Sequence, residues 1–325
     1  MKDEKPWLRR SVRPLRLRPG DTVGIAAPAS PFDEEAFARG VRVLEDMGYR
    51  IHLPEDLFTR CGYFAGHDRR RAAQLLALFK NPNIKGIFCA RGGYGCLRIL
   101  PLLDYDLIRC CPKVFVGFSD ITALHAALYH CCRLVTFHGP VVTSLGRIPP
   151  GACDALAAFL AGGEAQRLAF QNPRVIRAGS ASGVVLGGNL AVLCSLVGTP
   201  FSPDLSGAIL FLEDVHEKPY RIDRMLTQMR LAGCFQNLAG LVLGVFRDCG
   251  GMDAICTIVK DVFSTLEIPI LAGLSAGHGE DNRTLALGLE ARLDTASATL
   301  SYARAATRRP DEKVLEPAAK PGGKD

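Results

Sequence analysis

Residues 114–125 read Val-Phe-Val-Gly-Phe-Ser-Asp-Ile-Thr-Ala-Leu-His, and this stretch predicts how the first half of the chain folds. A β-branched and aromatic run, typical of a buried strand, stops at a Gly-x-Ser-Asp turn, and an apolar helix pattern begins at once. A serine at such a turn, here Ser119, exposes its hydroxyl at the end of a sheet, beside the free N–H groups of the new helix. This is the arrangement of a nucleophile elbow, although the motif is not the G-x-S-x-G of α/β-hydrolases. The competing interpretation is that Ser119 only caps the helix.

Strand and helix patterns alternate on both sides of this stretch. The expected strands cover residues 22–27, 49–53, 84–90, 114–117 and 134–137, and the expected helices cover 33–47, 68–80 and 119–132. Such alternation predicts a mostly parallel sheet with helices on both faces. Ligands of these sheets bind beyond the carboxyl ends of the strands, where both Ser119 and the glycine-rich segment Arg91–Gly95 are expected.

The second half of the chain returns to strands and helices after a change of composition near residues 145–180. Its expected strands cover 183–189, 208–212, 241–246 and 269–271, its helices 190–197, 220–231 and 253–263, and its short β segments 285–300. Five parts are therefore expected: an N-terminal extension (1–18), an N-terminal α/β domain (19–160), a linker (161–180), a C-terminal α/β domain with short β segments (181–303) and a disordered tail (304–325).

The composition is that of an ordinary globular protein, with 325 residues, 48% hydrophobic and 22% charged. The first residues lack the apolar segment of a secretion signal, and no apolar run is long enough to span a bilayer, so we expect a cytoplasmic protein without membrane contact. The net charge of +6 is concentrated at the chain ends without a nucleic-acid-binding motif, so no nucleic-acid partner is expected. The 12 cysteines lack the paired spacing of zinc ligands, which favours reduced thiols and no metal.

Three polar residues follow apolar strands and together suit acyl-transfer chemistry: Ser119, Glu213 and His278. A serine hydroxyl needs a neighbouring base, an imidazole supplies one near neutral pH, and a carboxylate can hold that imidazole in the correct tautomer. Each residue also has an ordinary interpretation, since Glu213 can be a solvated charge at a strand end and His278 a loop histidine. The other candidate bases, which spacing cannot separate from His278, are His67, His125, His138 and His216.

The segment Arg91-Gly-Gly-Tyr-Gly95 also has two functional interpretations. Its backbone N–H groups can bind an anion such as a phosphate, although the segment matches neither common phosphate-binding motif. Alternatively, Gly92 or Gly93 supplies one N–H of an oxyanion hole and Asp120 supplies the other; Gly93 and Asp120 are the expected pair. A purely structural tight turn is the third possibility.

Several segments, in order along the chain, resemble the LD-carboxypeptidases, a family of serine peptidases. They are Ile25–Ser30, Ala90–Gly95, Gly117–His125, Gly187–Leu190, Leu212–Val215 with Pro219–Arg224, and Gly277–Asn282. The match extends from about Pro19 to about Tyr302. One departure is Ala286, where many relatives have proline; it leaves the candidate catalytic residues untouched.

This resemblance implies a Ser–Glu–His triad formed by Ser119, Glu213 and His278, with the serine in the N-terminal domain and the other two in the C-terminal domain. It implies hydrolysis of the amide between the L-centre of diaminopimelate, or L-Lys, and the terminal D-Ala of murein tetrapeptide, in cell-wall recycling. It also implies a homodimer and no cofactor.

A free substrate carboxylate requires a cation or backbone donors, so Arg91, Gly92 and Arg221 are the expected substrate-binding residues. Two alternatives remain open at this point. One is an amide hydrolase that detoxifies a microcin C-like peptide-nucleotide. The other is a non-catalytic α/β module that binds a phosphorylated ligand through the Arg91 segment, which leaves Ser119, Glu213 and His278 without a shared role.

Overall fold

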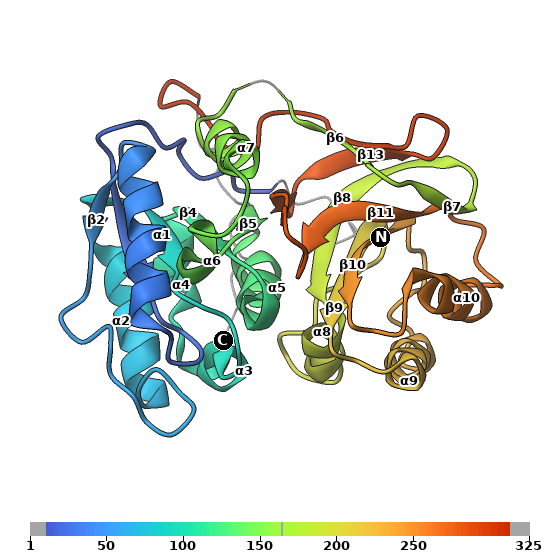
Figure 1. Cartoon of the computed structure of the whole chain (residues 1–325), viewed down its shortest axis with the longest axis horizontal. Helices are drawn as coiled ribbons and strands as arrows, with labels where there is room; N and C mark the ends of the chain where they lie inside the picture. The colour runs from blue at the N-terminus through green and yellow to red at the C-terminus, as the bar shows by residue number, and fades with distance from the viewer. Residues whose placement is uncertain (1–10, 164, 313–325) are drawn as a thin grey trace, which may run out of the picture.

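The computed structural model describes residues 11–163 and 165–312, which form two sheets with their helices, side by side (Figure 1). The six-stranded sheet has the order β12-β5-β4-β3-β1-β2, and the eight-stranded sheet has the order β6-β14-β13-β8-β9-β10-β11-β7. The expected α/β class, with a mostly parallel N-terminal sheet and a second C-terminal α/β unit, is confirmed.

The six-stranded sheet is parallel except at one edge. Its parallel strands are β1 (Thr22–Ala26), β2 (Arg50–His52), β3 (Ile84–Cys89), β4 (Val114–Gly117) and β5 (Thr136–His138). The edge strand β12 (Leu285–Leu287) comes from far along the chain and pairs antiparallel with β5. A strand from the C-terminal half thus closes the N-terminal sheet.

Helices bury both faces of this sheet, which explains the continuous apolar runs of its strands. Ile87 and Cys89 of β3 belong to the core on one face, and Phe88 between them belongs to the core on the other. The first face is covered by α2 (Asp68–Lys80), α4 (Tyr105–Cys110) and α5 (Thr122–Cys132), next to the short α3 (Cys96–Ile99). The second face is covered by α1 (Glu34–Asp46), α6 (Val142–Leu145) and α7 (Pro150–Leu160).

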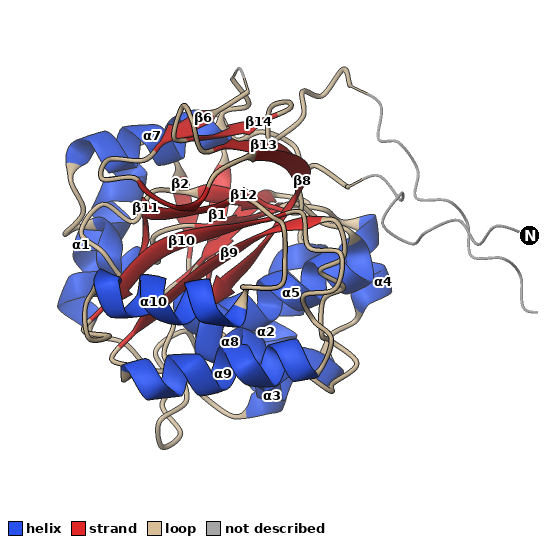
Figure 2. Cartoon of the chain, turned by 90° about the vertical axis from the view of Figure 1, so that its right-hand side faces the viewer, coloured by secondary structure: helices blue, strands red, loops and turns tan. Residues whose placement is uncertain are grey.

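The eight-stranded sheet has a parallel centre and antiparallel edges. The central strands are β8 (Ser180–Asn189), β9 (Ala208–Val215), β10 (Gly240–Arg247) and β11 (Ile270–Gly277). The antiparallel strands are β6 (Arg167–Ala169), β7 (Arg174–Arg177), β13 (Glu290–Asp294) and β14 (Thr299–Tyr302). One face carries α8 (Leu190–Leu196), α9 (Pro219–Leu231) and α10 (Met252–Val262), as Figure 2 shows.

The expected domain limits differ from the structure in three places. The supposed linker 161–180 contains β6 and β7, both of which pair within the eight-stranded sheet. Residues 11–18 are not a free extension, since Val12 bridges to Leu134 and Leu17 is buried. Residues 304–312 are not a disordered tail, since Arg308 bridges to Leu15. These segments have only a few apolar residues between charged ones, so they show no clear periodicity. Their partners lie far away in sequence, and the pairing could not be predicted. Residues 1–10 and 313–325 lie outside the described residues.

Two of the strands that are longer than expected place residues of the site. β9 continues to Val215, so Glu213 lies inside a strand rather than after it, and its side chain is fully buried. β11 continues to Gly277, so His278 directly follows a strand. Within the described ranges, no helix has both the length and the apolar character needed to span a bilayer.

Candidate active site

Ser119 lies at the sharp turn between β4 and α5, as its position in the sequence predicts. Its φ of 65° is in the left-handed region, which is uncommon for a residue with a side chain. Gly92 packs closely against this turn, since a Cβ added to Gly92 would lie 2.8 Å from the Cβ of Ser119. The absence of a side chain at Gly92 therefore lets the Arg91–Gly95 segment pack directly against Ser119.

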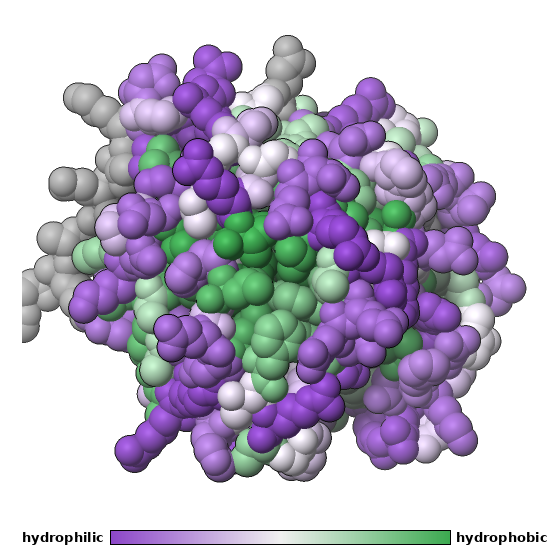
Figure 3. All heavy atoms as spheres, turned by 60° about the vertical axis from the view of Figure 1, so that its left-hand side comes forward, coloured by the Kyte–Doolittle hydropathy of each residue, from purple (hydrophilic) through white to green (hydrophobic). Residues whose placement is uncertain are grey.

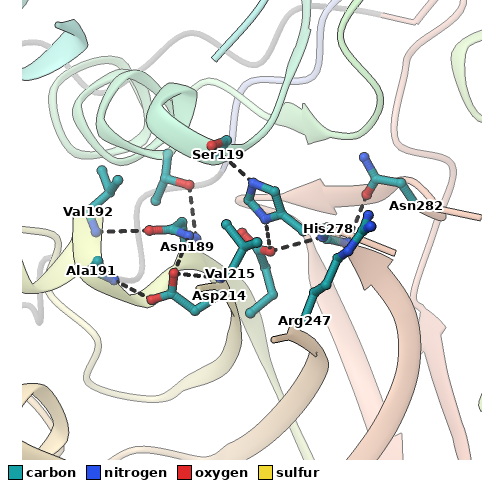
Figure 4. A network of polar contacts seen from close by, with 12 residues as sticks. Ser119, Asn189, Ala191, Val192, Asp214, Val215, Arg247, His278 and Asn282 are labelled. Atoms are coloured by element: carbon teal, nitrogen blue, oxygen red, sulfur yellow. Dashed lines mark hydrogen bonds and ion pairs between the residues drawn. The ribbon is translucent and has the colours of Figure 1, made fainter. Parts of the chain in front are cut away.

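His278 bridges Ser119 and Glu213 (Figure 4). Its Nε2 is 3.2 Å from Ser119 Oγ, and its Nδ1 is 2.6 Å from Glu213 Oε2. The backbone N–H of His278 also donates to Glu213 Oε2, at 3.1 Å. Because the buried carboxylate accepts the Nδ1 proton, Nε2 is left as the acceptor that faces the serine hydroxyl. The structure thus brings together the three residues singled out in the sequence, in the order that base-activated nucleophilic chemistry requires.

The parallel strands explain how Glu213 and His278 meet. β9 and β11 flank β10, so their carboxyl ends lie at the same edge of the sheet. Gly277 has a φ of 104°, and a Cβ there would lie 2.5 Å from Glu213 Oε2, so only glycine permits this approach. The Asn282 side chain accepts the Gly277 N–H at 2.8 Å and closes the following loop. Asn282 belongs to the quoted Gly277–Asn282 segment, but its holding role was not predicted.

Ser119 and His278 open into a cavity of about 520 Å³ between the Arg91 segment, the start of α1 and the α6 region. Arg91, Gly92 and Gly93 line it. That Arg91 and Gly92 bind substrate remains a prediction. Residues that the sequence analysis missed also line it: Asp33, Ala36, Phe118, Val141, Thr143, Ser144 and Arg147. Arg147 follows α6 in a stretch without a recognisable pattern, so only the tertiary structure could place it in this cavity.

The Arg91–Gly95 segment is held from behind by a buried arginine. Arg71 donates to the carbonyls of Gly95 (3.0 Å) and Gly66 (3.1 Å) and pairs with Asp68. At the front, Arg91 donates to the Pro31 carbonyl at 2.7 Å. Gly93 has a φ of 105°, lines the cavity, and its N–H has no hydrogen-bond partner among the described residues. This N–H is therefore available to a bound molecule.

The side chain of Asp120 has a structural task. It is buried, and its Oδ2 accepts the backbone N–H of Cys96 at 2.8 Å, which fastens the start of α3 to the Ser119 turn. Burial raises the pKa of this carboxyl above its usual range. The expectation for Asp120 concerned its backbone N–H, and that remains a prediction.

Arg221 is not among the residues that line the Ser119 cavity, and its role in substrate binding stays a prediction. It lies on the exposed side of α9, where its guanidinium is 3.5 Å from Glu217 and 3.4 Å from the Tyr220 hydroxyl. α9 begins only at Pro219, after the chain has left the sheet edge that carries Glu213. The need for a cation did not by itself distinguish Arg221 from the arginines that line the cavity.

The other candidate bases have different partners. His125 is buried, donates from Nε2 to the Gly117 carbonyl at 2.8 Å, and meets Thr136 Oγ1 with Nδ1; burial lowers its pKa to about 4. His138 is also buried, which holds its pKa well below the ordinary value. His67 contacts Cys61, and His216 is exposed beside Asp248. Among the five histidines considered, His278 is the one bonded to Ser119.

Comparisons with known proteins agree with this architecture. Models of the LD-carboxypeptidase N-terminal and C-terminal domains match residues 23–139 and 182–293. The probable murein peptide carboxypeptidase of Bacillus subtilis is 36% identical over 298 residues, which cover 89% of this chain and 93% of that protein.

Solved structures resemble almost the whole chain. The crystal structure of muramoyltetrapeptide carboxypeptidase from Oxalobacter formigenes has a TM-score of 0.78 and 30% identity, and the match covers 89% of this chain and 99% of that one. The structure of MccF in complex with glutamyl sulfamoyl guanosine has a TM-score of 0.82 and 26% identity, with 90% and 98% covered.

Proposed function

Since this chain belongs to the LD-carboxypeptidase family, we propose that it is a serine carboxypeptidase acting on murein tetrapeptide. The bond cleaved joins the L-centre of the third residue, diaminopimelate or L-Lys, to the terminal D-Ala. The observation that carries the proposal is the hydrogen-bonded row Ser119–His278–Glu213 at the edge of the cavity. The names of the relatives support the choice of substrate.

The proposed chemistry proceeds through an acyl-enzyme. His278 Nε2 takes the proton of Ser119 Oγ as that oxygen attacks the amide carbonyl, and Glu213 stabilises the resulting imidazolium through Nδ1–H. The imidazolium then gives its proton to the nitrogen of the leaving D-Ala. In the second half, His278 takes a proton from water, the hydroxide attacks the ester carbonyl, and the proton returns to Ser119 Oγ.

The oxyanion of each tetrahedral intermediate is assigned to the backbone N–H groups of Gly93 and Asp120. Gly93 supports this role because it lines the cavity and its N–H has no hydrogen-bond partner in the described part of the chain. Asp120 follows Ser119 directly at the beginning of a helical segment, where N–H groups are free. Donors positioned in this way typically contribute about 10²–10³ in rate each.

The charges at the cavity suit a substrate with several charged groups near the cleaved bond. Arg91 adjoins Gly92, which packs on Ser119, so we assign it the carboxylate of the leaving D-Ala. Arg147 and Asp33 remain for the far end of the third residue, which in diaminopimelate carries both a carboxylate and an ammonium group. Lysine lacks that carboxylate, so diaminopimelate is the preferred third residue.

The test is release of D-Ala from purified murein tetrapeptide by wild type, Ser119→Ala and Ser195→Ala. Ser195 is a matched control, because it lies on α8 and its hydroxyl bonds the Ala191 carbonyl. We expect release by wild type and Ser195→Ala and only residual release by Ser119→Ala. Equal release by all three would exclude Ser119 as the nucleophile, and no release by any would exclude the murein substrate.

The structural similarity to MccF favours one second candidate, an amide hydrolase that acts on a microcin C-like peptide-nucleotide, with glutamyl sulfamoyl guanosine as the test compound. The discriminating measurement is the ratio of kcat/KM for that compound to kcat/KM for murein tetrapeptide. A ratio above one would replace the murein assignment with this second candidate.

Assembly and location complete the proposal. Hydrophobic residues gather at the centre of one face and hydrophilic residues surround them (Figure 3), which supports a homodimer in solution. Sedimentation equilibrium tests this, and a monomer at all concentrations would contradict it. We place the enzyme in the cytoplasm, in cell-wall recycling, and fractionation of cells tests that location.

A further inference from the structure

The candidate site is divided between the two sheets, so Ser119 must be aligned with His278 across the two halves of the molecule. Ser119 comes from the turn after β4, whereas Glu213 and His278 come from β9 and the end of β11. The contact between Ser119 Oγ and His278 Nε2, at 3.2 Å, is a single hydrogen bond that must be kept at the right length. A rigid connection between the two halves next to this bond would serve that purpose.

A second row of hydrogen bonds makes such a connection (Figure 4). Thr122, at the start of α5, accepts the backbone N–H of Asn189 at Oγ1, at 3.0 Å. The side chain of Asn189 donates to Asp214 Oδ1 at 2.9 Å. We call these three residues the Thr122–Asn189–Asp214 chain. Thr122 is three positions after the serine, and Asp214 is next to Glu213.

The backbone at this junction is built for close approach. Gly188 has a φ of 139°, and a Cβ there would lie 2.5 Å from Thr122 Oγ1. Asn189 is the register partner of Glu213 in the β8–β9 pair and also caps α8, accepting the Val192 N–H at 3.1 Å. A displacement of Asn189 therefore moves both the Ser119 side and the Glu213 side of the site.

Asp214 holds the far end of the Thr122–Asn189–Asp214 chain, although burial of its carboxylate is unfavourable. It is 2% exposed, and burial with the neighbouring Glu213 carboxylate raises its pKa to about 6. Its two oxygens accept three N–H groups, from the Asn189 side chain and from the backbones of Ala191 and Val215. A buried carboxylate is weak support for stability alone, but it fixes geometry when every donor around it is satisfied.

We propose that the Thr122–Asn189–Asp214 chain positions Ser119 against His278 across the two halves of the molecule. Its members do not line the cavity that holds Ser119, so they act through the catalytic residues and not on the substrate. The inference rests on the proposed nucleophilic role of Ser119.

The test replaces Thr122 and leaves the catalytic residues intact. Thr122→Val keeps the shape but removes the acceptor, Thr122→Ser keeps the acceptor, and Thr122→Ala is the second variant if the valine form does not fold. Thr299→Val is the matched control, because Thr299 is a buried threonine on β14 whose hydroxyl bonds Ser297 Oγ at 2.8 Å. The readouts are kcat and KM for D-Ala release, the rate of Ser119 labelling by a fluorophosphonate, and the melting temperature.

We expect Thr122→Val to lower kcat and the labelling rate by about 10- to 100-fold, with KM nearly unchanged, since a small misplacement of reacting groups has effects of this order. Thr122→Ser should restore both rates, and Thr299→Val should leave them unchanged at a similar melting temperature. Folded Thr122→Val and Thr122→Ala with wild-type rates would overturn the proposal, as would equal rate losses in Thr299→Val. Labelling of Ser119 does not depend on the murein substrate, so it tests the role of the Thr122–Asn189–Asp214 chain even if wild type releases no D-Ala.

Discussion

Replacing Glu213 with glutamine separates the two effects of a buried carboxylate, on chemistry and on stability. Glu213 is fully buried, and Oε2 accepts both the Nδ1–H and the backbone N–H of His278, at 2.6 and 3.1 Å. The amide of Glu213→Gln carries no charge to stabilise the imidazolium, and its N–H₂ group can hold the imidazole of His278 in the wrong tautomer. In a comparable triad such a change lowers kcat about 10⁴-fold, which corresponds to about 5 kcal/mol of transition-state stabilisation.

In contrast to kcat, the stability of Glu213→Gln should be equal to or higher than that of wild type. Oε1 of Glu213 is buried and has no hydrogen-bond partner among the described residues, so the amide removes an incompletely solvated charge. We therefore expect the melting temperature of Glu213→Gln to equal or exceed that of wild type.

The assay is the rate of D-Ala release at saturating tetrapeptide, with thermal unfolding measured in the same buffer. Glu217→Gln is the matched control, because Glu217 lies on the same segment and pairs with Arg221 outside the cavity. A kcat for Glu213→Gln within tenfold of wild type would refute the role of the carboxylate. A large fall in melting temperature would refute the stability argument.

Three further predictions follow from single contacts. Gly92→Ala would place a Cβ 2.8 Å from the Cβ of Ser119, so kcat should fall about 100-fold. Gly151→Ala is the control, because there is open space around Gly151, and it should leave kcat unchanged. Equal kcat values for the two variants would contradict this prediction. The buried His125 has a pKa of about 4, so the unfolded chain takes up the proton first and stability falls as pH drops below 6.5. His125→Gln should therefore reduce the loss between pH 7 and 5 by about 2 kcal/mol in urea titrations, and an unchanged loss would disprove it. Arg147→Gln should lower kcat/KM for diaminopimelate tetrapeptide but not for its lysine analogue; parallel losses would remove Arg147 from specificity.

The local pattern of the chain predicted the elements that carry the site, because burial and turn chemistry act over short distances. The helix expected at residues 68–80 is α2, and the Gly-x-Ser-Asp turn does join β4 to α5. The apolar runs indicated buried parallel strands, whose carboxyl ends then suggested where Ser119, Glu213 and His278 lie. The resemblance to the LD-carboxypeptidases chose among interpretations that spacing alone left open.

What the sequence by itself determined was therefore the class of fold, the order of its main strands and helices, and the polar residues that follow those strands. The pairing of β12 with β5, the strands within residues 161–180, and the placement of Arg147 in the cavity but not Arg221 were decided only by the tertiary structure. So was the separation of His278 from His125 and His138. Each depends on contacts between residues far apart in the chain, and no local periodicity records which distant partner a buried group will meet.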